Sequence, residues 1–290
     1  MRSERTATQA RSEITPEQLD QIRELIYKET GILVDSKKNY IMKARIEKRM
    51  LESKARSFRE YQRRLLLSEK NGELQNLVEE LTVNETYFFR DFPQLQSFAE
   101  KALPLLLSEK REQGDHTLKI WSAACSTGEE PYTLSIIVQE MIADYDDWTT
   151  TILATDVDRT VLRAARKGEY GSRAMKDTPL AYREKYFSSN GETWQVLPHT
   201  AEPIRFEQMN LIDRRAMRRQ SHYDFIFCRN VLIYFSDQSR KKVVNSFYDS
   251  LNPGGFLFLG SSESVGRITA AFELTRIDDY LFYRKPKQMR

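Results

Sequence analysis

The sequence predicts an α/β fold in which a small all-helical domain precedes a doubly wound, mainly parallel sheet. Three observations lead to this prediction. Short apolar runs alternate with helical stretches after about residue 90, which is typical of parallel strands buried on both faces. Before residue 82, only helix signals occur. Residues 180–210 fit neither pattern and indicate a small antiparallel β insertion.

The composition limits the class of protein. Of 290 residues, 40% are hydrophobic and 30% are charged, which suits a soluble globular chain. No apolar run approaches the roughly 18 residues that a membrane span needs, so no membrane insertion is expected. The polar stretch 1–13 is expected to be a disordered tail. Cys125 and Cys228 lack CxxC spacing and favour a reducing, cytoplasmic setting, and with only three histidines no metal site is expected.

Residues 14–81 predict four helices that pack as a small bundle. A capping box that starts at Thr15, followed by proline at the first helical position, begins the first helix. The caps Ser36 and Ser57 begin the next two helices, and a fourth follows with apolar residues at helical spacing. Residues 82–93 are assigned to a linker between the two domains.

The second part of the chain predicts its strands in order. Four apolar runs are expected to form the buried strands, namely 118–124, 150–156, 223–230 and 255–262. The segments FELTRI and YLFYRK, separated by two aspartates, predict a terminal hairpin. The segments TWQVLP and EPIRFEQ are both assigned to the antiparallel insertion at about 180–210.

Residues 121–134, WSAACSTGEEPYTL, combine a strand, a turn at Gly128 and a helix start, as in a nucleotide-binding turn. Glu129 and Glu130 stand where a phosphate would need bare N–H groups, so the expected ligand lacks phosphate or carries positive charge. Asp156 ends the next strand, where an acidic side chain accepts hydrogen bonds from a ribose diol. S-adenosylmethionine has a ribose, a sulfonium and an ammonium group, and it meets these conditions. The alternative is that Glu129 and Glu130 only cap a helix.

Four motifs together resemble the CheR-type chemotaxis methyltransferases, namely NETYFFRD (84–91), AACSTGEEPYTL (123–134), FCRNVLIYF (227–235) and LNPGGFLFLGSSES (251–264). The resemblance spans residues from about 15 to 285 and implies a Rossmann-like sheet of the S-adenosylmethionine-dependent methyltransferase type. It also implies methyl transfer to glutamate side chains of membrane chemoreceptors, with S-adenosylhomocysteine as the product. The helical domain (14–81), the linker (82–93) and a methyltransferase domain (94–290) match the organisation of that family.

The resemblance implies roles for residues in these motifs. Arg90 and Tyr234 are the implied catalytic residues. The implied cofactor contacts lie at strand ends and in the segment between the domains: Asn84, Thr86, Arg90, Glu130, Asp156, Asn210, Leu211, Arg229 and Asn230. Taken singly, three residues have simpler interpretations: Asn210 as a turn residue, Arg90 as the ion-pair partner of Asp91, and Tyr234 as a strand residue.

The chemistry needs no general base if the acceptor is a glutamate. A carboxylate with an unperturbed pKa of about 4.3 is already ionised at neutral pH. The sequence has no Ser-His-Asp constellation and no acidic-Pro-Pro-Tyr motif of amide and adenine methyltransferases. Catalysis is therefore expected to come from holding the carboxylate and the methyl group in line. Arg90 would orient the carboxylate through a network shared with Tyr234.

A basic stretch, residues 36–56, is expected to bind the acidic helical region of the receptor. It has eight basic residues against two acidic ones, a net charge of +6. Arg45, Arg49 and Arg56 are predicted to fall on one helical stripe that complements a helix of glutamates. The alternative is a solvated basic helix face, and the second basic cluster at 213–220 is interpreted in that way.

Two other function classes stay open from the sequence. An RNA methyltransferase on the same fold would use basic clusters on phosphates, but no aromatic platform or RNA-binding module is found, so no nucleic-acid partner is expected. A non-catalytic S-adenosylmethionine-binding scaffold is disfavoured by the presence of Arg90 and Tyr234. The short connection YFSSNGETWQV argues against a C-terminal receptor peptide as a tether, and a monomer is expected.

Overall fold

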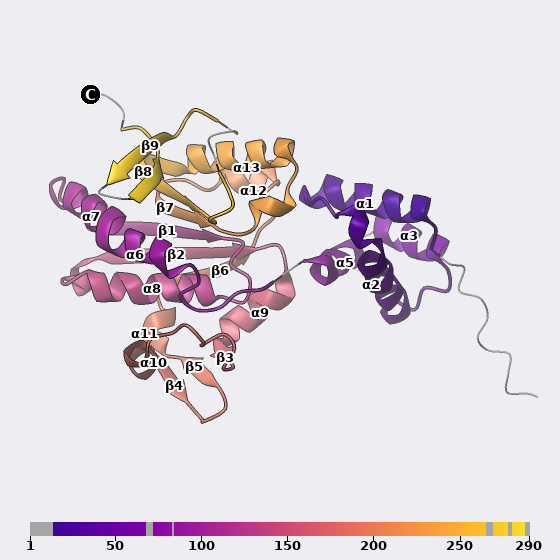
Figure 1. Ribbon diagram of the computed structural model, residues 1–290, viewed down its shortest axis with the longest axis horizontal. Helices are drawn as coiled ribbons and strands as arrows, with labels where there is room; N and C mark the ends of the chain where they lie inside the picture. Colours follow the sequence, from indigo (N-terminus) through magenta and orange to yellow (C-terminus); the bar gives the residue numbers. More distant parts are fainter. Residues whose placement is uncertain (1–13, 68–71, 83, 265–268, 278–279, 288–290) are drawn as a thin grey trace, which may run out of the picture. The chain divides into compact units, whose positions relative to one another are not determined.

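The chain divides into two compact units, Met1–Val83 and Asn84–Arg290 (Figure 1). The computed structural model describes residues 14–67, 72–82, 84–264, 269–277 and 280–287. The tail expected at 1–13 therefore lies outside the described residues. Residues 84–93, assigned on sequence to a linker, group with the second unit, and Phe88 is fully buried in the core of that unit.

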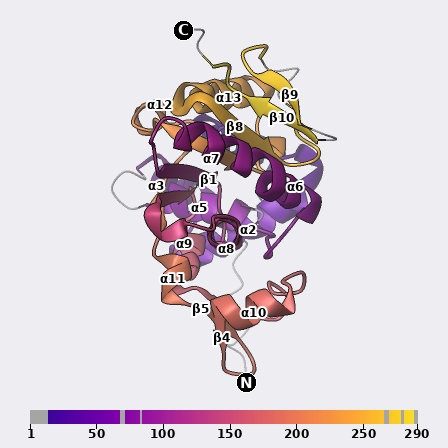
Figure 2. The ribbon, with the colours of Figure 1, turned by 90° about the vertical axis from the view of Figure 1, so that its left-hand side faces the viewer.

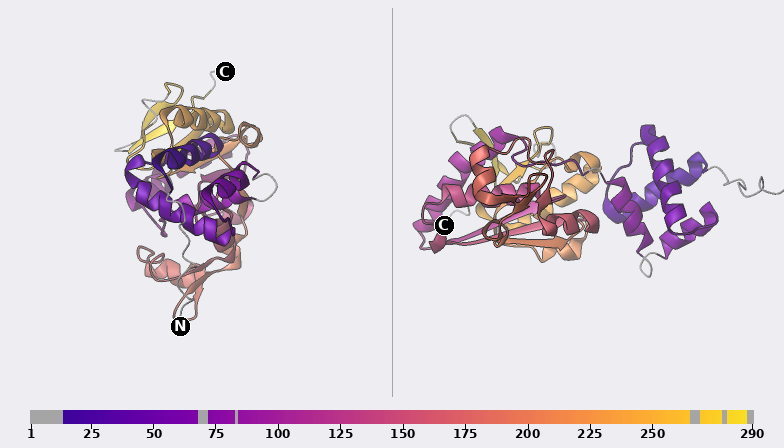
Figure 3. Two further views of the ribbon diagram at one scale, coloured as in Figure 1. Left: turned by 90° about the vertical axis from the view of Figure 1, so that its right-hand side faces the viewer. Right: turned by 90° about the horizontal axis from the view of Figure 1, so that it is seen from below.

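The first unit contains the helices that its apolar spacing predicts. They are α1 (Pro16–Thr30), α2 (Asn39–Glu52), α3 (Phe58–Leu66) and α5 (Glu73–Leu81), with a short 3-10 helix at Ser36–Lys38 (Figure 3). The capping box at Thr15 forms, and Gly31 ends α1 in the left-handed conformation. Ser36 does not cap α2, because Asp35 caps the 3-10 helix and α2 begins only at Asn39. The apolar faces of these helices meet in one buried core.

The second unit contains a seven-stranded sheet in the order β6-β2-β1-β7-β8-β10-β9. Its strands are β1 (Thr117–Ala123), β2 (Thr149–Asp156), β6 (Ile204–Gln208), β7 (Tyr223–Cys228), β8 (Leu251–Leu259), β9 (Glu273–Ile277) and β10 (Tyr280–Arg284). The pairs from β6 through β8 are parallel, whereas β8–β10 and β10–β9 are antiparallel. The predicted mainly parallel sheet is therefore confirmed. The terminal hairpin also forms, although its two aspartates lie outside the described residues.

Helices cover both faces of this sheet (Figures 1 and 2). One face carries α6 (Phe92–Ser97), a π-helix (Phe98–Ala102), α7 (Leu103–Arg111), α8 (Glu129–Met141) and α9 (Arg159–Lys167). The other face carries α12 (Arg214–Arg218) and α13 (Asp237–Ser250). Phe225 and Ile226, neighbours on β7, belong to the two different core clusters, as expected for a strand buried on both faces. The layering leaves the carboxyl ends of the strands as the edge where ligands bind in such sheets.

A separate antiparallel sheet, in the order β3-β5-β4, forms the expected insertion (Figure 2). It contains β3 (Glu169–Tyr170), β4 (Phe187–Ser189) and β5 (Trp194–Val196), and α10 (Leu180–Tyr186) and α11 (Pro198–Ala201) accompany it. Two details of the prediction are wrong. The small sheet already begins at Glu169, and EPIRFEQ does not belong to it, because β6 pairs in parallel with β2 at the edge of the main sheet. A short alternating run fits either an insertion strand or a half-covered edge strand, so its pattern could not separate them.

Candidate functional site

The turn between β1 and α8 has a backbone that depends on a glycine. Ala124 and Ser126 adopt left-handed backbone angles, and Gly128 follows with φ +97°. A Cβ atom at Gly128 would lie 2.9 Å from the Cβ atom of Ala165 on α9. Both the positive φ and the close approach therefore require glycine. The chain can then turn tightly into α8, whose first residue is Glu129.

The two glutamates at the start of α8 are held in different ways. The Glu129 side chain is buried, and its Oε2 atom accepts a hydrogen bond of 2.7 Å from Thr127 Oγ1. Glu130 Oε1 accepts a hydrogen bond of 2.7 Å from Ser122 Oγ on β1. Burial raises the pKa of both carboxyl groups above the ordinary glutamate value. Carboxylates therefore occupy the helix start, and this arrangement would repel a phosphate.

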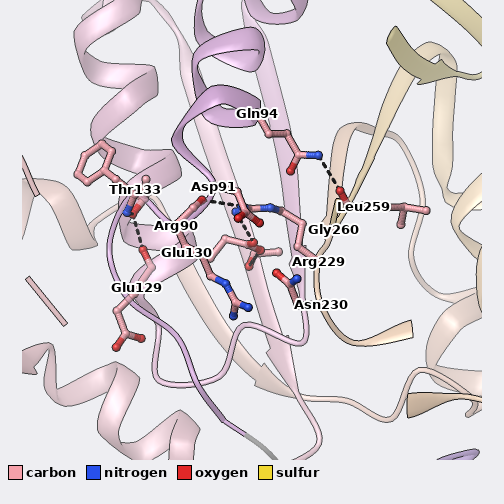
Figure 4. A network of polar contacts seen from close by, with 12 residues as sticks. Arg90, Asp91, Gln94, Glu129, Glu130, Thr133, Arg229, Asn230, Leu259 and Gly260 are labelled. Carbon is pink, nitrogen blue, oxygen red and sulfur yellow. Dashed lines mark hydrogen bonds and ion pairs between the residues drawn. The ribbon is translucent and has the colours of Figure 1, made fainter. Parts of the chain in front are cut away.

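Arg229, at the end of β7, joins three of the sequence motifs (Figure 4). Its Nη1 atom lies 3.2 Å from Glu130 Oε2, and its Nη2 atom lies 3.1 Å from Asp91 Oδ2. The same Nη2 donates a hydrogen bond of 2.6 Å to the carbonyl oxygen of Arg90. The Arg229 side chain is only 4% exposed, so these contacts compensate a charge that is almost fully buried.

This network changes the interpretation of two residues. Asp91 pairs with Arg229, and within the described residues Arg90 instead binds the Glu85 carbonyl, so the simple alternative of an Arg90–Asp91 ion pair is wrong. The Arg229 guanidinium faces Glu130 and Asp91, and its predicted contact with the cofactor stays a prediction. Asp91 was not among the predicted site residues. The available signal was a basic residue, Arg229, at the end of a buried strand, because such a charge needs acidic partners.

Asp156, at the end of β2, lies beside the turn that precedes α8. Its Oδ2 atom accepts a hydrogen bond of 2.8 Å from the Ser126 amide, and its Oδ1 atom accepts one of 2.9 Å from the Asp158 amide. The residue is 8% exposed, and burial raises its pKa to about 6. Asn84 donates a hydrogen bond of 3.1 Å to Asp158 Oδ2, so the NETYFFRD motif reaches the same strand end.

Arg90 and Tyr234 lie in less buried surroundings. Arg90 Nη1 donates a hydrogen bond of 2.7 Å to the carbonyl oxygen of Glu85, and its guanidinium lies 5.8 Å from the centre of the Tyr87 ring. Tyr234 is not a strand residue; it ends the 3-10 helix Leu232–Tyr234 that follows β7. No hydrogen bond between Arg90 and Tyr234 is found in the described part of the chain, so their shared network stays a prediction.

Of the remaining predicted contacts, Asn210 and Leu211 follow β6, Asn230 follows β7, and Thr86 lies in the segment before α6. Asn210 Oδ1 accepts a hydrogen bond of 3.1 Å from the Ile212 amide, so this side chain stabilises the turn after β6, as its simpler interpretation predicts. Leu211 is buried, and Thr86 and Asn230 are half-buried. Asn230 adopts a left-handed backbone with φ +60° directly after β7. A cofactor role for these residues remains a prediction.

In the first unit, the basic stripe differs from the prediction. Arg49 donates from Nε and Nη2 to the two carboxylate oxygens of Glu73, at 3.1 and 2.8 Å, and it also pairs with Glu52. The Arg49 and Glu73 side chains are only 13% and 7% exposed, so Arg49 joins α2 to α5 and does not present its charge to a partner. Arg56 lies beyond the end of α2 and so cannot share a helical stripe with Arg45. The sequence pattern could not reveal this, because Glu73 is distant along the chain.

The donors and acceptors at the strand ends suit S-adenosylmethionine. Asp156 binds the turn that precedes α8, Glu130 binds Ser122 on β1, and both carboxylates can accept further hydrogen bonds beyond those already made. Among the described residues, the buried Nε atom of Arg229 has no hydrogen-bond partner. In the same ranges, no cluster of His, Cys, Asp and Glu suits a metal ion, and no helix has the length and apolarity to cross a bilayer.

Comparisons with known proteins cover both units. Residues 84–281 match the family model of the SAM binding domain of CheR methyltransferases, and residues 17–82 match that of their all-alpha domain. Chemotaxis protein methyltransferase 2 of Vibrio cholerae is 38% identical over 274 residues, 94% of each chain. Chemotaxis protein methyltransferase 1 of Pseudomonas aeruginosa is 33% identical over 267 residues, 90% of this chain and 95% of its own. Among solved structures, the magnesium protoporphyrin IX methyltransferase of Synechocystis PCC 6803 with bound SAM is 11% identical. It matches with a TM-score of 0.34 over 75% of this chain and 90% of that one.

Proposed function

The chain belongs to the CheR methyltransferase family, and we propose that it methylates glutamate side chains of chemoreceptors to form methyl esters. Methylation in chemotaxis with S-adenosylmethionine as the cofactor is the function that its two family domains and its relatives carry. The observation that supports this site most directly is a pair of carboxylates: Asp156 is buried at the end of β2, and the Glu130 side chain, in the first turn of α8, is 14% exposed and contacts Arg229. Such a site favours a ligand that has a ribose and a positive charge and lacks phosphate.

The proposed cofactor contacts follow from these groups. Asp156 would accept hydrogen bonds from the ribose hydroxyls, and Glu130 would face the positively charged part of the cofactor. Arg229 would hold Glu130 in place through their contact of 3.2 Å. Further contacts are assigned to Asn84, Thr86, Asn210, Leu211 and Asn230. When bound, S-adenosylmethionine supplies an electrophilic methyl group.

The proposed reaction uses the acceptor glutamate in the ionised form that it has at neutral pH. Arg90 would orient this carboxylate, because a guanidinium binds a carboxylate through parallel hydrogen bonds. In the structure, Arg90 is held by the Glu85 carbonyl and lies near the Tyr87 ring, so its side chain has a defined starting position. Tyr234 would face the reacting group and exclude water. No residue of the chain is required to remove a proton from the acceptor.

The proposed partner is the acidic helical region of a membrane chemoreceptor. Arg45 remains the candidate docking residue on α2, together with Arg56 beyond the helix end, whereas Arg49 is committed to Glu73. The two cysteines are buried free thiols, which suits the reducing cytoplasm where such receptor regions lie.

The test is methyl transfer with labelled S-adenosylmethionine and receptor-enriched membranes. The expected result is label on a receptor band that is released by mild base, because methyl esters hydrolyse under these conditions. A reaction with total RNA in place of membranes separates the two acceptor classes, and Asp156→Ala controls for dependence on the cofactor site. Base-stable label, or label on RNA alone, would contradict glutamate methylation.

A further inference from the structure

Glu263 lies in the turn after β8 and binds backbone groups of two different strand ends. Its Oε2 atom accepts hydrogen bonds from the amides of Asn230 (2.9 Å) and Gly260 (2.7 Å). Its Oε1 atom accepts a hydrogen bond of 3.2 Å from the Ile233 amide. The Glu263 amide also donates to the Gly260 carbonyl oxygen at 2.9 Å, which closes the turn. One carboxylate therefore joins the segment after β7 to the end of β8.

The segment that Glu263 holds carries two of the proposed site residues. Asn230 is a proposed cofactor contact, and the Ile233 amide lies one residue before Tyr234. Glu263 thus binds the backbone at both ends of the stretch 230–233. The hydrogen bonds are charge-assisted, and such bonds are shorter and stronger than those between neutral groups.

The packing around Glu263 leaves this segment little freedom. A Cβ atom at Gly260 would lie 2.8 Å from the Asn230 amide nitrogen and 2.8 Å from Glu263 Oε2. Asn230 has a left-handed backbone with φ +60°, a conformation that asparagine adopts more readily than most residues other than glycine and that its surroundings here select. The hydrogen bond that the Asn230 amide donates to Glu263 helps to fix this conformation.

The end of β8 is itself hydrogen-bonded to α6, the helix that begins two residues after Arg90. Gln94, on α6, donates a hydrogen bond of 2.6 Å from Nε2 to the carbonyl oxygen of Leu259, the last residue of β8. Figure 4 shows this bond beside Arg229, Asn230 and Gly260. The end of β8 is therefore bound to α6 on one side, through Gln94, and to the segment after β7 on the other, through Glu263.

We propose that Glu263 is a positioning residue for methyl transfer, which sets the place of Asn230 and Tyr234 by holding the backbone of residues 230–233. The proposal rests on the proposed function, because the roles of Asn230 and Tyr234 belong to it. Glu263 does not touch the acceptor or the cofactor in this role; it acts through the backbone.

The experiment compares wild type with Glu263→Gln, which keeps the size of the side chain but turns one acceptor into a donor that faces backbone amides. Glu184→Gln, an exposed position on α10, is the matched control. Single-turnover methylation of receptor membranes at saturating S-adenosylmethionine is measured for each protein below its melting temperature. Glu263→Gln is expected to lower this rate about tenfold or more and to speed amide exchange in residues 230–233, while Glu184→Gln behaves as wild type.

A rate for Glu263→Gln within twofold of wild type would overturn the proposal, because a merely structural glutamate changes the melting temperature and not the rate of the folded, saturated protein. If Glu263→Gln does not fold, Gly260→Ala displaces the Asn230 amide from the other side, and the same rate criterion applies. If wild type does not methylate receptors at all, the proposed function fails. In that case the positioning role is judged from amide exchange and from the affinity for S-adenosylhomocysteine, both compared between Glu263→Gln and wild type. Faster exchange with weaker binding in the variant supports the role, and unchanged values reject it.

Discussion

Two arginines with acidic partners, one in each unit and each with a side chain at most 13% exposed, show how the same interaction serves different purposes. Arg229 contacts Glu130 and Asp91 at the carboxyl end of the sheet, and Arg49 contacts Glu73 between two helices. The side chains of both arginines are shielded from solvent. The Arg49 pair joins two helices of one small core, whereas the Arg229 network joins three motifs beside the turn that starts α8. Burial and pairing of an arginine therefore do not by themselves indicate a functional site. The position of the arginine in the fold, here at the carboxyl ends of parallel strands, is the more informative criterion.

The largest effect is expected for Arg229→Ala, which should affect both folding and activity. Removal of the guanidinium leaves Glu130 and Asp91 uncompensated, and breaking a buried pair in this way costs about 3–5 kcal/mol of folding free energy. We expect binding of S-adenosylhomocysteine to weaken by a hundredfold or more, on the order of the same free energy. Calorimetry and chemical denaturation measure the two quantities, with the exposed Arg218→Ala as control. If Arg229→Ala binds S-adenosylhomocysteine almost as tightly as wild type, the contacts of Arg229 serve only the stability of the fold.

The corresponding change in the helical unit, Arg49→Ala, should affect stability alone. It removes the arginine that compensates the buried Glu73 carboxylate, so the unit should lose about 3–5 kcal/mol of folding free energy, whereas product affinity should stay at the wild-type value. The double variant Arg49→Met with Glu73→Leu should recover most of the lost stability, because buried ion pairs can be replaced by apolar residues of similar volume. Denaturation followed by amide exchange in α2 and α5 tests this. A loss of product affinity in Arg49→Ala would remove the contrast between the two arginines.

A more selective effect is expected for Arg90→Ala, because Arg90 lies at the surface of the site and carries no buried pair. Its loss should lower the single-turnover rate on the order of a hundredfold while changing product affinity much less, since it would orient only the acceptor. Tyr234→Phe keeps the ring and should be milder. Between pH 7 and 9 all three proteins should give flat rate profiles. A rate that climbs tenfold per pH unit in wild type, and not in Tyr234→Phe, would identify Tyr234 as a base and exclude an ionised carboxylate as acceptor.

The fold could be predicted from the sequence because its signals are local. Alternating strands and helices, the capping box at Thr15 and the glycine turn at Gly128 each depend on neighbouring residues, and each occurs where expected. The exceptions depend on contacts between distant segments. The strand 204–208 joins the main sheet because β2 provides its partner, and that pairing cannot be deduced from its short alternating pattern.

The candidate site was predictable to the extent that its residues follow strand ends. Asp156 and Arg229 lie at the carboxyl ends of β2 and β7, where the topology places ligand contacts. The partners of charged groups were not predictable. Asp91, the partner of Arg229, and Glu73, the partner of Arg49, come from segments that only folding brings together. The sequence alone therefore could not show which basic residues are paired within the protein and which are available to a partner.

A smaller effect, which again belongs to the strand-end region alone, is expected from the titration of Asp156. Burial raises its pKa from the usual aspartate range to about 6, so the carboxylate is ionised above that pH and protonated below it. Protonation removes the charge and turns one oxygen into an O–H donor, so affinity for S-adenosylhomocysteine should fall by about tenfold per pH unit below pH 6. Above pH 7 it should be constant.

The variant Asp156→Asn should bind more weakly at pH 7 and should lose the pH dependence around 6. Each lost hydrogen bond to a charged group should weaken the binding free energy by on the order of 1.5–3 kcal/mol. Calorimetric titration from pH 5 to 8 gives both curves. A wild-type affinity that is flat across this range would show that Asp156 either stays ionised or does not bind the ribose.

The smallest effect is expected for Arg45→Glu, because a charge that is partly open to solvent contributes little by itself. Its side chain is half-buried on α2, and in contrast to Arg49 it is the proposed contact with the acidic receptor. Charge reversal should reduce receptor methylation at limiting receptor by about fivefold, which corresponds to roughly 1 kcal/mol, while product affinity stays unchanged. Raising the salt concentration should lower receptor methylation by the wild type toward the level of the variant, since exposed charges are screened within about 10 Å at 0.1 M. Arg63→Glu, an exposed reversal on α3, controls for the change in net charge. If Arg45→Glu methylates receptors as well as Arg63→Glu does at every salt concentration, the basic face of α2 is a solvated surface, and neither arginine of that helix takes part in docking.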